Sequence, residues 1–167
     1  VGDDKKVSDL SNGNYIDHER LKMPLLDKAE KLGVTAIISD ESSYGNYIWD
    51  VLSETLCYAA SLVPEVTEDL TQIDDAMKLG YNWVRGPFEL VDEIGIEYFI
   101  NRLQSNGKEV PDFLLNSANK KFYSSSNSTL SALSPSGKPT PILRSKGVLR
   151  FSEARQTLKP ANSNESG

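Results

Sequence analysis

Apolar residues recur at helical spacing through the middle of the chain, and the clearest run lies between residues 47 and 63. The apolar positions follow one another at intervals of one to four residues, with acidic and serine side chains between them: Ile48, Val51, Leu52, Thr55, Leu56, Ala59 and Val63. Such a stripe is typical of an amphipathic helix that packs on several neighbours. The pattern therefore predicts an all-α fold, a helical bundle around a central buried helix at about 47–63.

Shorter runs on both sides of this stripe predict further helices. Apolar residues fall at helical spacing over 18–32, 67–80 and 96–103, and Pro111 is placed to begin a last short helix. Residues 34–38 are different, because this run is short and rich in β-branched side chains. We expect it to form a strand or an extended connector.

The connection between residues 80 and 95 has the composition of a helix end, an aromatic loop and a helix start. Gly80 is expected to end one helix with a positive φ. Tyr81 and Trp83 bring large apolar side chains into the loop. Proline is favoured at the first position of a helix, so Gly86-Pro87 should open the next one, which ends at Gly95.

Both ends of the chain are more polar than its middle. Residues 1–17 have no periodic apolar pattern, and the sequence after residue 120 is basic and rich in serine and proline. Within that extension, residues 129–133 and 140–143 flank a turn signal and are expected to pair as a small hairpin. We therefore divide the chain into an N-terminal segment, a helical domain, a basic extension and a linker: 1–17, 18–120, 121–158 and 159–167.

Charge and composition exclude several classes of function. The net charge is −6, but residues 121–167 carry seven basic and two acidic residues, +5, which leaves −11 on residues 1–120. An acidic domain is unsuited to a phosphate backbone, so nucleic acid is not expected as a partner. The sequence has no apolar run long enough for a membrane span, and its single cysteine, Cys57, suits the reducing cytoplasm. Because the chain starts without methionine, we expect it to be cut from a longer protein.

Residues suited to catalysis, cofactor binding or metal binding are not grouped in this sequence. A dinucleotide site needs a glycine-rich turn, and no two glycines have the GxG spacing. The single histidine, His18, is expected at a helix terminus on the surface rather than in a catalytic site. Pairs of acidic residues lack the spacing of a calcium loop. We therefore predict no catalytic residue, bound cofactor or metal ligand in this chain.

The central motif resembles a known family. Asp75 to Gly80, a short aromatic loop and Gly86 to Gly95 are similar to the helical C-terminal domain of 3-hydroxyacyl-CoA dehydrogenases, a fold like that of the 6-phosphogluconate dehydrogenase C-terminal domain. The similarity is good over residues 44–107. The residues of the family motif are Gly86, Pro87, Phe88 and Gly95.

This resemblance implies a role within a larger enzyme. The chain would be a fragment of a multifunctional fatty-acid oxidation protein, which oxidises 3-hydroxyacyl-CoA to 3-oxoacyl-CoA with NAD. The fragment would be inactive alone and would act as a structural or dimerisation domain that supports the acyl-CoA site. NAD and acyl-CoA would bind only in the parent enzyme. The partners of this chain would be the nucleotide-binding domain and the first helical copy of the same parent chain, which are missing here. A homodimer of this chain is the other arrangement that the resemblance implies. The alternative is a non-catalytic helical module for protein–protein interaction.

One position indicates which copy of the domain this is. In the family, the copy that contacts substrate begins its long helix with Gly-Phe-x-x-Asn-Arg, and alignment from Gly45 places Trp49 at that asparagine. An indole has one donor and no acceptor, so it cannot replace the amide. The resemblance thus implies the second tandem copy; a divergent first copy that uses Asn46 is the alternative. Four aromatic residues are predicted to form the interface with a partner: Tyr44, Tyr47, Trp49 and Trp83.

Overall fold

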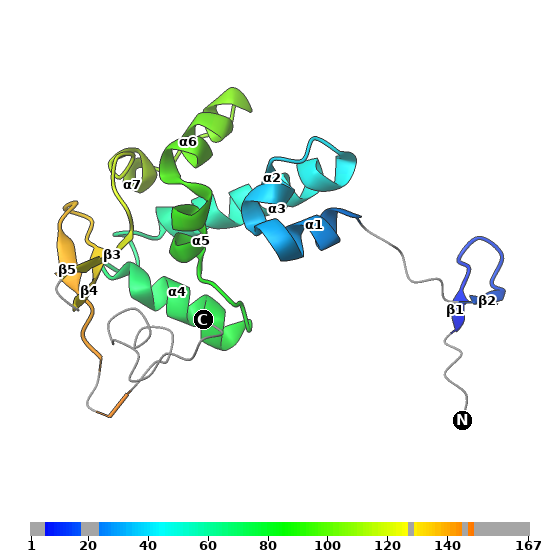
Figure 1. Cartoon of the computed structure of the whole chain (residues 1–167), viewed down its shortest axis with the longest axis horizontal. Coiled ribbons are helices and arrows are strands. Elements are labelled where there is room, and N and C mark those ends of the chain that lie inside the picture. The colour runs from blue at the N-terminus through cyan, green and yellow to red at the C-terminus, as the bar shows by residue number, and fades with distance from the viewer. Residues whose placement is uncertain (1–5, 18–23, 127–128, 145–146, 149–167) are drawn as a thin grey trace, which may run out of the picture.

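The computed structural model describes residues 6–17, 24–126, 129–144 and 147–148, and it is mainly helical (Figure 1). The expected helix start at 18–23, with His18, and the expected linker at 159–167 lie outside these residues. The helices are α1 (Pro24–Leu32), α2 (Val34–Ile38), α3 (Ser43–Ser61), α4 (Leu70–Gly80), α5 (Pro87–Ile94), α6 (Ile96–Ser105) and α7 (Asp112–Leu115). The strands are β1 (Lys6–Ser8), β2 (Tyr15–Asp17), β3 (Tyr123–Ser126), β4 (Thr129–Leu133) and β5 (Pro139–Pro141).

The long helix α3 is the centre of the helical part. It begins at Ser43, earlier than predicted, because the hydroxyl of Ser42 accepts a hydrogen bond from Gly45 N (3.2 Å) and caps the first turn. Helices α2, α5 and α7 all pack against it. The prediction of a helical bundle around this helix is therefore confirmed, with two small sheets added to it.

The hydrophobic core continues beyond residue 120, where the sequence analysis placed the end of the domain. Phe122 is fully buried and its ring packs edge-on against Phe88 of α5, with a centroid distance of 5.0 Å. Ala132 and Leu133 of β4 are also buried in this core. The first part of the basic extension is thus packed against the helices.

The expected hairpin in the extension is present, and it belongs to a three-stranded antiparallel sheet. β4 pairs with β5, and β3 adds to the other edge of β4. The sequence did not reveal β3, since its run of serines has no alternation of apolar and polar residues. A second hairpin, β1–β2, precedes the helices and stands apart from them in Figure 1.

Two local predictions were wrong. Residues 34–38 form helix α2 rather than a strand or connector, because packing against α1, α3 and α5 buries Ala36 and Ile38 and overrides the β-branched composition. Gly80 lies within the last turn of α4 without a positive φ; the left-handed residue is Asn82, with φ 56°. The helix therefore ends through an asparagine, which tolerates this conformation better than most residues.

A buried carboxylate joins three segments of the fold. Asp74 of α4 is fully buried, and its Oδ1 accepts a hydrogen bond from Phe88 N (2.9 Å). Its Oδ2 accepts from Glu89 N (3.2 Å) and from the hydroxyl of Tyr123 in β3 (2.8 Å). Asp74 therefore caps the start of α5 from a neighbouring helix and also holds β3.

Gly86 lets α4 and α5 approach closely enough for this cap. A Cβ at position 86 would overlap the backbone and side chain of Asp74. The remaining N–H at this end, that of Gly86 itself, donates to Glu89 Oε2 (2.9 Å). Pro87 has no N–H to satisfy, so the first turn of α5 leaves no backbone donor unpaired.

A second carboxylate anchors β3 to α5 in the same way. Asp92 Oδ1 accepts a hydrogen bond from Phe122 N and Oδ2 accepts one from Tyr123 N, each at 2.8 Å. Burial raises the pKa of Asp92, and these two hydrogen bonds act in the opposite direction. Asp74 and Asp92 together fix the position at which the chain leaves the helices and enters the sheet.

We predict that Gly86→Ala destabilises the protein whereas Gly80→Ala does not. The new methyl group at position 86 would force Asp74 and α5 apart, at a cost of more than about 2 kcal/mol in the free energy of unfolding. Gly80 has nothing within 4 Å of an added Cβ and a helical backbone, so alanine should stabilise by about 0.5 to 1 kcal/mol. Urea unfolding of both variants tests this; equal effects would contradict the proposed close approach.

We also predict a pH dependence of stability that Asp74→Asn removes. Burial raises the pKa of Asp74 from 3.8 to about 6, and the hydrogen bonds from Phe88, Tyr123 and Glu89 offset this only in part. The folded chain therefore holds this proton more tightly than the unfolded chain. Its contribution to the free energy of unfolding should fall by up to about 3 kcal/mol between pH 4 and pH 6.5, and then level off.

The measurement is urea unfolding of the wild type and Asp74→Asn at several pH values from 4 to 7. Other carboxylates titrate in both proteins, so the informative quantity is the difference between the two unfolding free energies. A difference that stays constant over this range would contradict the raised pKa of Asp74.

Candidate functional site

Helix α3 carries two lines of mainly apolar residues along its length, here called the inner and the outer seam. The two seams are offset by one residue in the sequence. The inner seam faces the core and has members spaced alternately four and three residues apart: Gly45, Trp49, Leu52, Leu56 and Ala59. The outer seam consists of the residue before each of these, together with Tyr47: Tyr44, Tyr47, Ile48, Val51, Thr55 and Tyr58. The two seams lie side by side along the helix because consecutive residues differ by about 100° around its axis.

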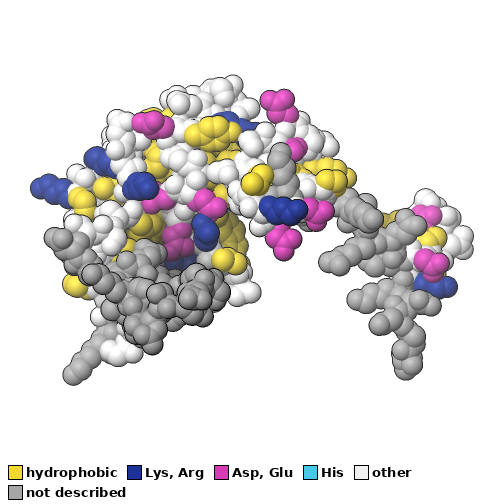
Figure 2. Space-filling model, viewed as in Figure 1, with side chains coloured by type: hydrophobic (Ala, Val, Ile, Leu, Met, Phe, Trp, Pro, Cys, Tyr) yellow, Lys and Arg dark blue, Asp and Glu magenta, His cyan; other side chains and the backbone are white. Residues whose placement is uncertain are grey.

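Most of the outer seam is exposed on this chain, and its two remaining members, Ile48 and Thr55, are half-buried. Tyr44, Tyr47, Val51 and Tyr58 are 54%, 69%, 51% and 67% exposed, whereas Trp49 in the inner seam is 2% exposed. The sequence analysis had placed Val51 in the buried stripe, and the structure corrects this. Figure 2 shows hydrophobic side chains at several places on the visible surface of the helical part.

Trp49 lies inside this chain, which differs from its assignment as an interface residue. Its ring packs edge-on against Phe99 of α6 with a centroid distance of 5.5 Å, and the guanidinium carbon of Arg102 lies 4.2 Å from its ring centroid. Its buried Nε1 has no hydrogen-bond partner within the described part of the chain. Trp49 therefore joins α3 to α6 through packing and a cation–π contact.

The other predicted site residues fall into two groups. Tyr44 and Tyr47 lie together on the outer seam, whereas Trp83 is half-buried in the connection between α4 and α5. The motif residues Gly86, Pro87 and Phe88 are buried at the start of α5, and Gly95, with φ 92°, separates α5 from α6. The sequence analysis missed Tyr58, although Tyr44, Val51 and Tyr58 follow one another at seven-residue intervals along the sequence.

The acidic edge beside the outer seam is partly neutralised. Lys108, in the segment after α6, brings its Nζ within 3.2 Å of Asp50 Oδ1 and 3.0 Å of Glu54 Oε1. The same Nζ donates a hydrogen bond to Ser53 Oγ (3.0 Å). This cluster fastens the end of α6 to α3 and lowers the negative charge along one side of the seam.

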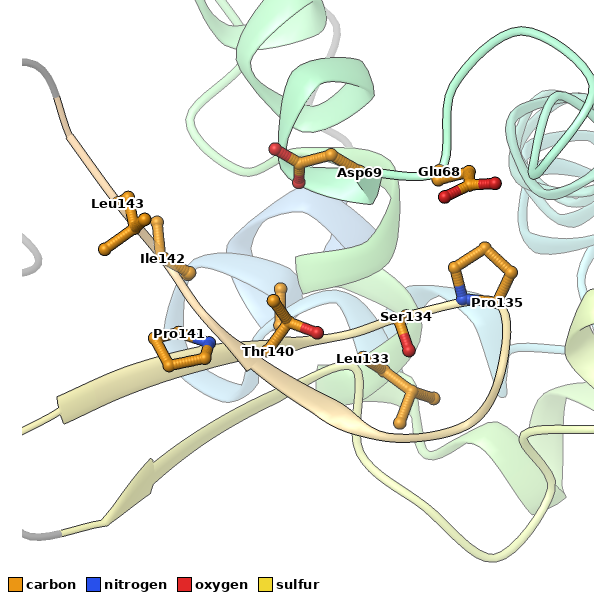
Figure 3. Close-up of a pocket in the computed structure, with 10 residues that line it drawn as sticks. Glu68, Asp69, Leu133, Ser134, Pro135, Thr140, Pro141, Ile142 and Leu143 are labelled. Carbon is orange, nitrogen blue, oxygen red and sulfur yellow. The ribbon is translucent and has the colours of Figure 1, made fainter.

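Other parts of the described chain offer little for chemistry. The hollow in Figure 3, about 340 Å³, lies between Glu68 and Asp69 before α4 and the apolar side chains of the β4–β5 hairpin. Burial raises the pKa of the Cys57 thiol to about 11, so it is a poor nucleophile near neutral pH. No group of three or more His, Cys, Asp or Glu side chains in the described residues is arranged to hold a metal ion.

Among the helices described, none combines the length and apolar character that crossing a membrane requires.

Comparison with known proteins agrees with the motif and the fold. Residues 47–126 match the family described as the C-terminal domain of 3-hydroxyacyl-CoA dehydrogenase. This match begins at residue 47, within α3, and runs through α7 and β3, and so includes Asp74, Asp92 and Tyr123. No solved structure matches the chain.

The relatives found by sequence are much longer than this chain. A Bacillus subtilis protein named as a 3-hydroxyacyl-CoA dehydrogenase is 33% identical over 124 residues, which are 70% of this chain and 16% of the relative. A Rickettsia felis protein named as a trifunctional enzyme of the fatty acid oxidation complex is 37% identical over 91 residues, 54% of this chain and 12% of the relative. A Rickettsia prowazekii protein of the same name is 46% identical over 55 residues, 33% of this chain and 8% of the relative.

The chain thus spans about one sixth or less of the curated relatives it matches. Its helices α3 to α7, the buried Gly-Pro-Phe start of α5 and the match over residues 47–126 all lead to the same assignment. This chain belongs to the family of 3-hydroxyacyl-CoA dehydrogenase C-terminal domains.

Proposed function

We propose that this chain is the second, supporting helical copy in a multifunctional 3-hydroxyacyl-CoA dehydrogenase of fatty-acid β-oxidation. The whole enzyme oxidises 3-hydroxyacyl-CoA to 3-oxoacyl-CoA with NAD, in the cytoplasm. The family match and the names of the longer relatives support this reaction. The observation that carries the assignment to the second copy is the burial of Trp49 at the position of the asparagine that contacts substrate in this family.

Trp49 is unsuited to the role of that asparagine. Its ring is enclosed between α3 and α6, and its only polar atom, Nε1, is a buried donor. An acyl-CoA carbonyl or hydroxyl at this place would need the space that the indole fills. The volume that serves substrate contact in one copy therefore serves packing in the other.

Asn46, the residue that a divergent first copy would use, is engaged at the start of the same helix. Its Nδ2 donates a hydrogen bond to the backbone oxygen of Glu41 (3.1 Å), and the side chain is exposed. This contact fits a role in closing the first turn of α3 rather than a role in a substrate cleft. It favours the second-copy assignment.

In this proposal the NAD site and the catalytic base belong to the rest of the parent enzyme. The chain supplies a rigid helical wall, held by Asp74 and the Phe88, Phe113 and Phe122 ring cluster, against which the catalytic parts are positioned. The exposed outer seam favours the second candidate function, a non-catalytic interaction module. Reading the coding sequence on either side distinguishes the two, since a glycine-rich nucleotide-binding half upstream supports the dehydrogenase.

We predict that Trp49→Ala in the intact parent enzyme lowers stability and leaves turnover unchanged. Loss of the buried indole should cost about 3 to 5 kcal/mol in the free energy of unfolding. At a temperature where the variant is folded, kcat/KM for 3-hydroxyacyl-CoA should equal that of the wild type, because the first copy makes the substrate contacts.

Trp49→Phe is the matched control. It keeps the edge-on contact with Phe99 and removes only the unpartnered Nε1 and part of the ring, so we expect a loss of about 1 to 2 kcal/mol. Thermal denaturation and steady-state kinetics are measured on the same preparations. A large loss of turnover at unchanged stability, or acyl-CoA bound against Trp49, would refute the second-copy assignment.

A further inference from the structure

We propose that the hollow between the start of α4 and the β4–β5 hairpin binds residues 149–151 of this same chain in an extended conformation. These three residues lie outside the described part of the chain and follow directly after Val148. Three features carry the inference: the two unlike walls of the hollow, the sequence of the segment and the place where the described chain ends. The inference goes beyond the proposed function and does not depend on it.

The hollow has one acidic wall and one apolar wall. Glu68 and Asp69 stand on one side, and Figure 3 shows the side chains of the hairpin opposite them. The apolar side chains that line the hollow are Ala132, Leu133, Pro135, Pro141, Ile142 and Leu143. Leu143 is 89% exposed, whereas Leu133 is buried. A ligand that fits this hollow therefore needs a cation on one side and apolar groups on the other.

The acidic wall can accept such a cation. Asp69 Oδ1 accepts a hydrogen bond from Thr71 N (2.9 Å) as the N-cap of α4. Glu68 is exposed and has no ion-pair partner among the residues that the structure describes. An arginine suits a carboxylate beside an apolar surface, because its stem covers apolar atoms while its guanidinium binds the carboxylate.

Two contacts hold the apolar wall in place. Ile142 N donates a hydrogen bond to Leu130 O (2.9 Å), which continues the pairing of β4 with β5. Arg144 Nη1 donates to Asp75 Oδ2 (2.9 Å), and these two side chains are only 21% and 16% exposed. The segment after β5 is thus fastened to the sheet and to α4, so the hollow is formed before a ligand enters it.

Residues 149–151 alternate in the way that these two walls require. They are Leu149, Arg150 and Phe151. Successive side chains of an extended segment point to opposite sides, so Leu149 and Phe151 lie together against the hairpin while Arg150 faces the acidic wall. Glu153 is the next residue on the apolar side and ends the fit, because its carboxylate would be buried there without a partner.

The described chain ends where such a segment can enter the hollow. Gly147 lies in a turn with φ 88°, a conformation that glycine adopts without strain. A turn reverses the chain, so Val148 heads back towards the hairpin residues that precede Arg144. Residues 149–151 can then run beside residues 141–143 of the apolar wall.

A weak contact is sufficient, because the segment and the hollow belong to one chain. A short connection gives an effective concentration in the millimolar range, so contacts that would bind a free peptide only weakly keep a tethered one bound. The bound segment covers Leu143 and ties the start of α4 to the sheet, in addition to the ion pair between Arg144 and Asp75.

Cleavage by chymotrypsin after Phe151 in the 167-residue chain tests the proposal, since this bond is accessible only when the segment leaves the hollow. Each rate is divided by that of a free peptide of residues 145–158 with the same sequence. We expect the wild type to be cleaved at least about tenfold more slowly than its peptide. Arg150→Glu and Glu68→Arg should each speed cleavage about three- to tenfold, because like charges would then meet.

The double variant, Arg150→Glu with Glu68→Arg, should return to within about twofold of the wild type, because opposite charges face each other again. Lys159→Glu is the matched control: it makes the same change of charge in the same part of the chain and should leave the cleavage rate unchanged.

Leu143→Asp tests the apolar wall by the same measurement. It should speed cleavage after Phe151 because Leu149 and Phe151 lose their apolar contact. Val84→Asp is the control, since Val84 is 92% exposed in the α4–α5 connection and should have no effect. Circular dichroism confirms that every variant is folded.

Disulfide trapping tests the geometry. In a Cys57→Ser background, Glu68→Cys combined with Arg150→Cys should oxidise readily to a disulfide within one chain. Glu68→Cys combined with Lys159→Cys should do so far less, because residue 159 lies beyond the segment that the hollow binds.

A wild-type chain that is cleaved after Phe151 as fast as its free peptide overturns the proposal, and so does a double charge reversal that fails to restore protection. Disulfides that join two chains would show that the segment enters the hollow of a second copy, which also overturns it. These outcomes leave the proposed function untouched, because that function is read from turnover and stability of the Trp49 variants.

Discussion

The hydrogen bonds of the buried Asp74 carboxylate are the interaction on which the rest of this fold depends. The Asp74 side chain accepts hydrogen bonds from two backbone N–H groups in the first turn of α5 and from the hydroxyl of Tyr123 in β3. It therefore joins α4, α5 and the three-stranded sheet. A buried charge is costly unless its hydrogen-bonding capacity is filled, and here three donors fill it. Its removal would leave two backbone N–H groups and a hydroxyl without partners in the interior.

This constraint explains why the sequence around α5 has its particular form. Gly86 has no side chain because Asp74 occupies that space, and Pro87 starts the helix without an N–H that would need a partner. Phe88 then enters the ring cluster with Phe113 and Phe122. The residues by which the family is recognised are therefore structural, and family membership alone does not assign them a chemical role.

The long helix α3 connects this structural core to the proposed role in a larger enzyme. Its inner seam packs against the core, and Trp49 contacts Phe99 and Arg102 of α6. In the proposed function, Trp49 stands where the substrate-contacting copy has a polar residue. Its outer seam is left exposed. Under the proposed function the domain makes no substrate contact, and the buried face of this helix serves packing within the domain.

The sequence by itself determined the helices other than α2, the helix start at Gly86-Pro87, the β4–β5 hairpin and the family, because periodicity, turn chemistry and motif spacing are local properties. Only the tertiary structure decided which of the two seams of α3 is buried, since seams one residue apart are equally apolar in sequence. The same holds for α2, where packing overrides a β-branched run, and for β3, which has no pattern of its own. The role of Asp74 also required the fold, because its partners Phe88 and Tyr123 lie 14 and 49 residues away along the chain. Contacts over such separations are set by how the elements pack, which local patterns do not encode.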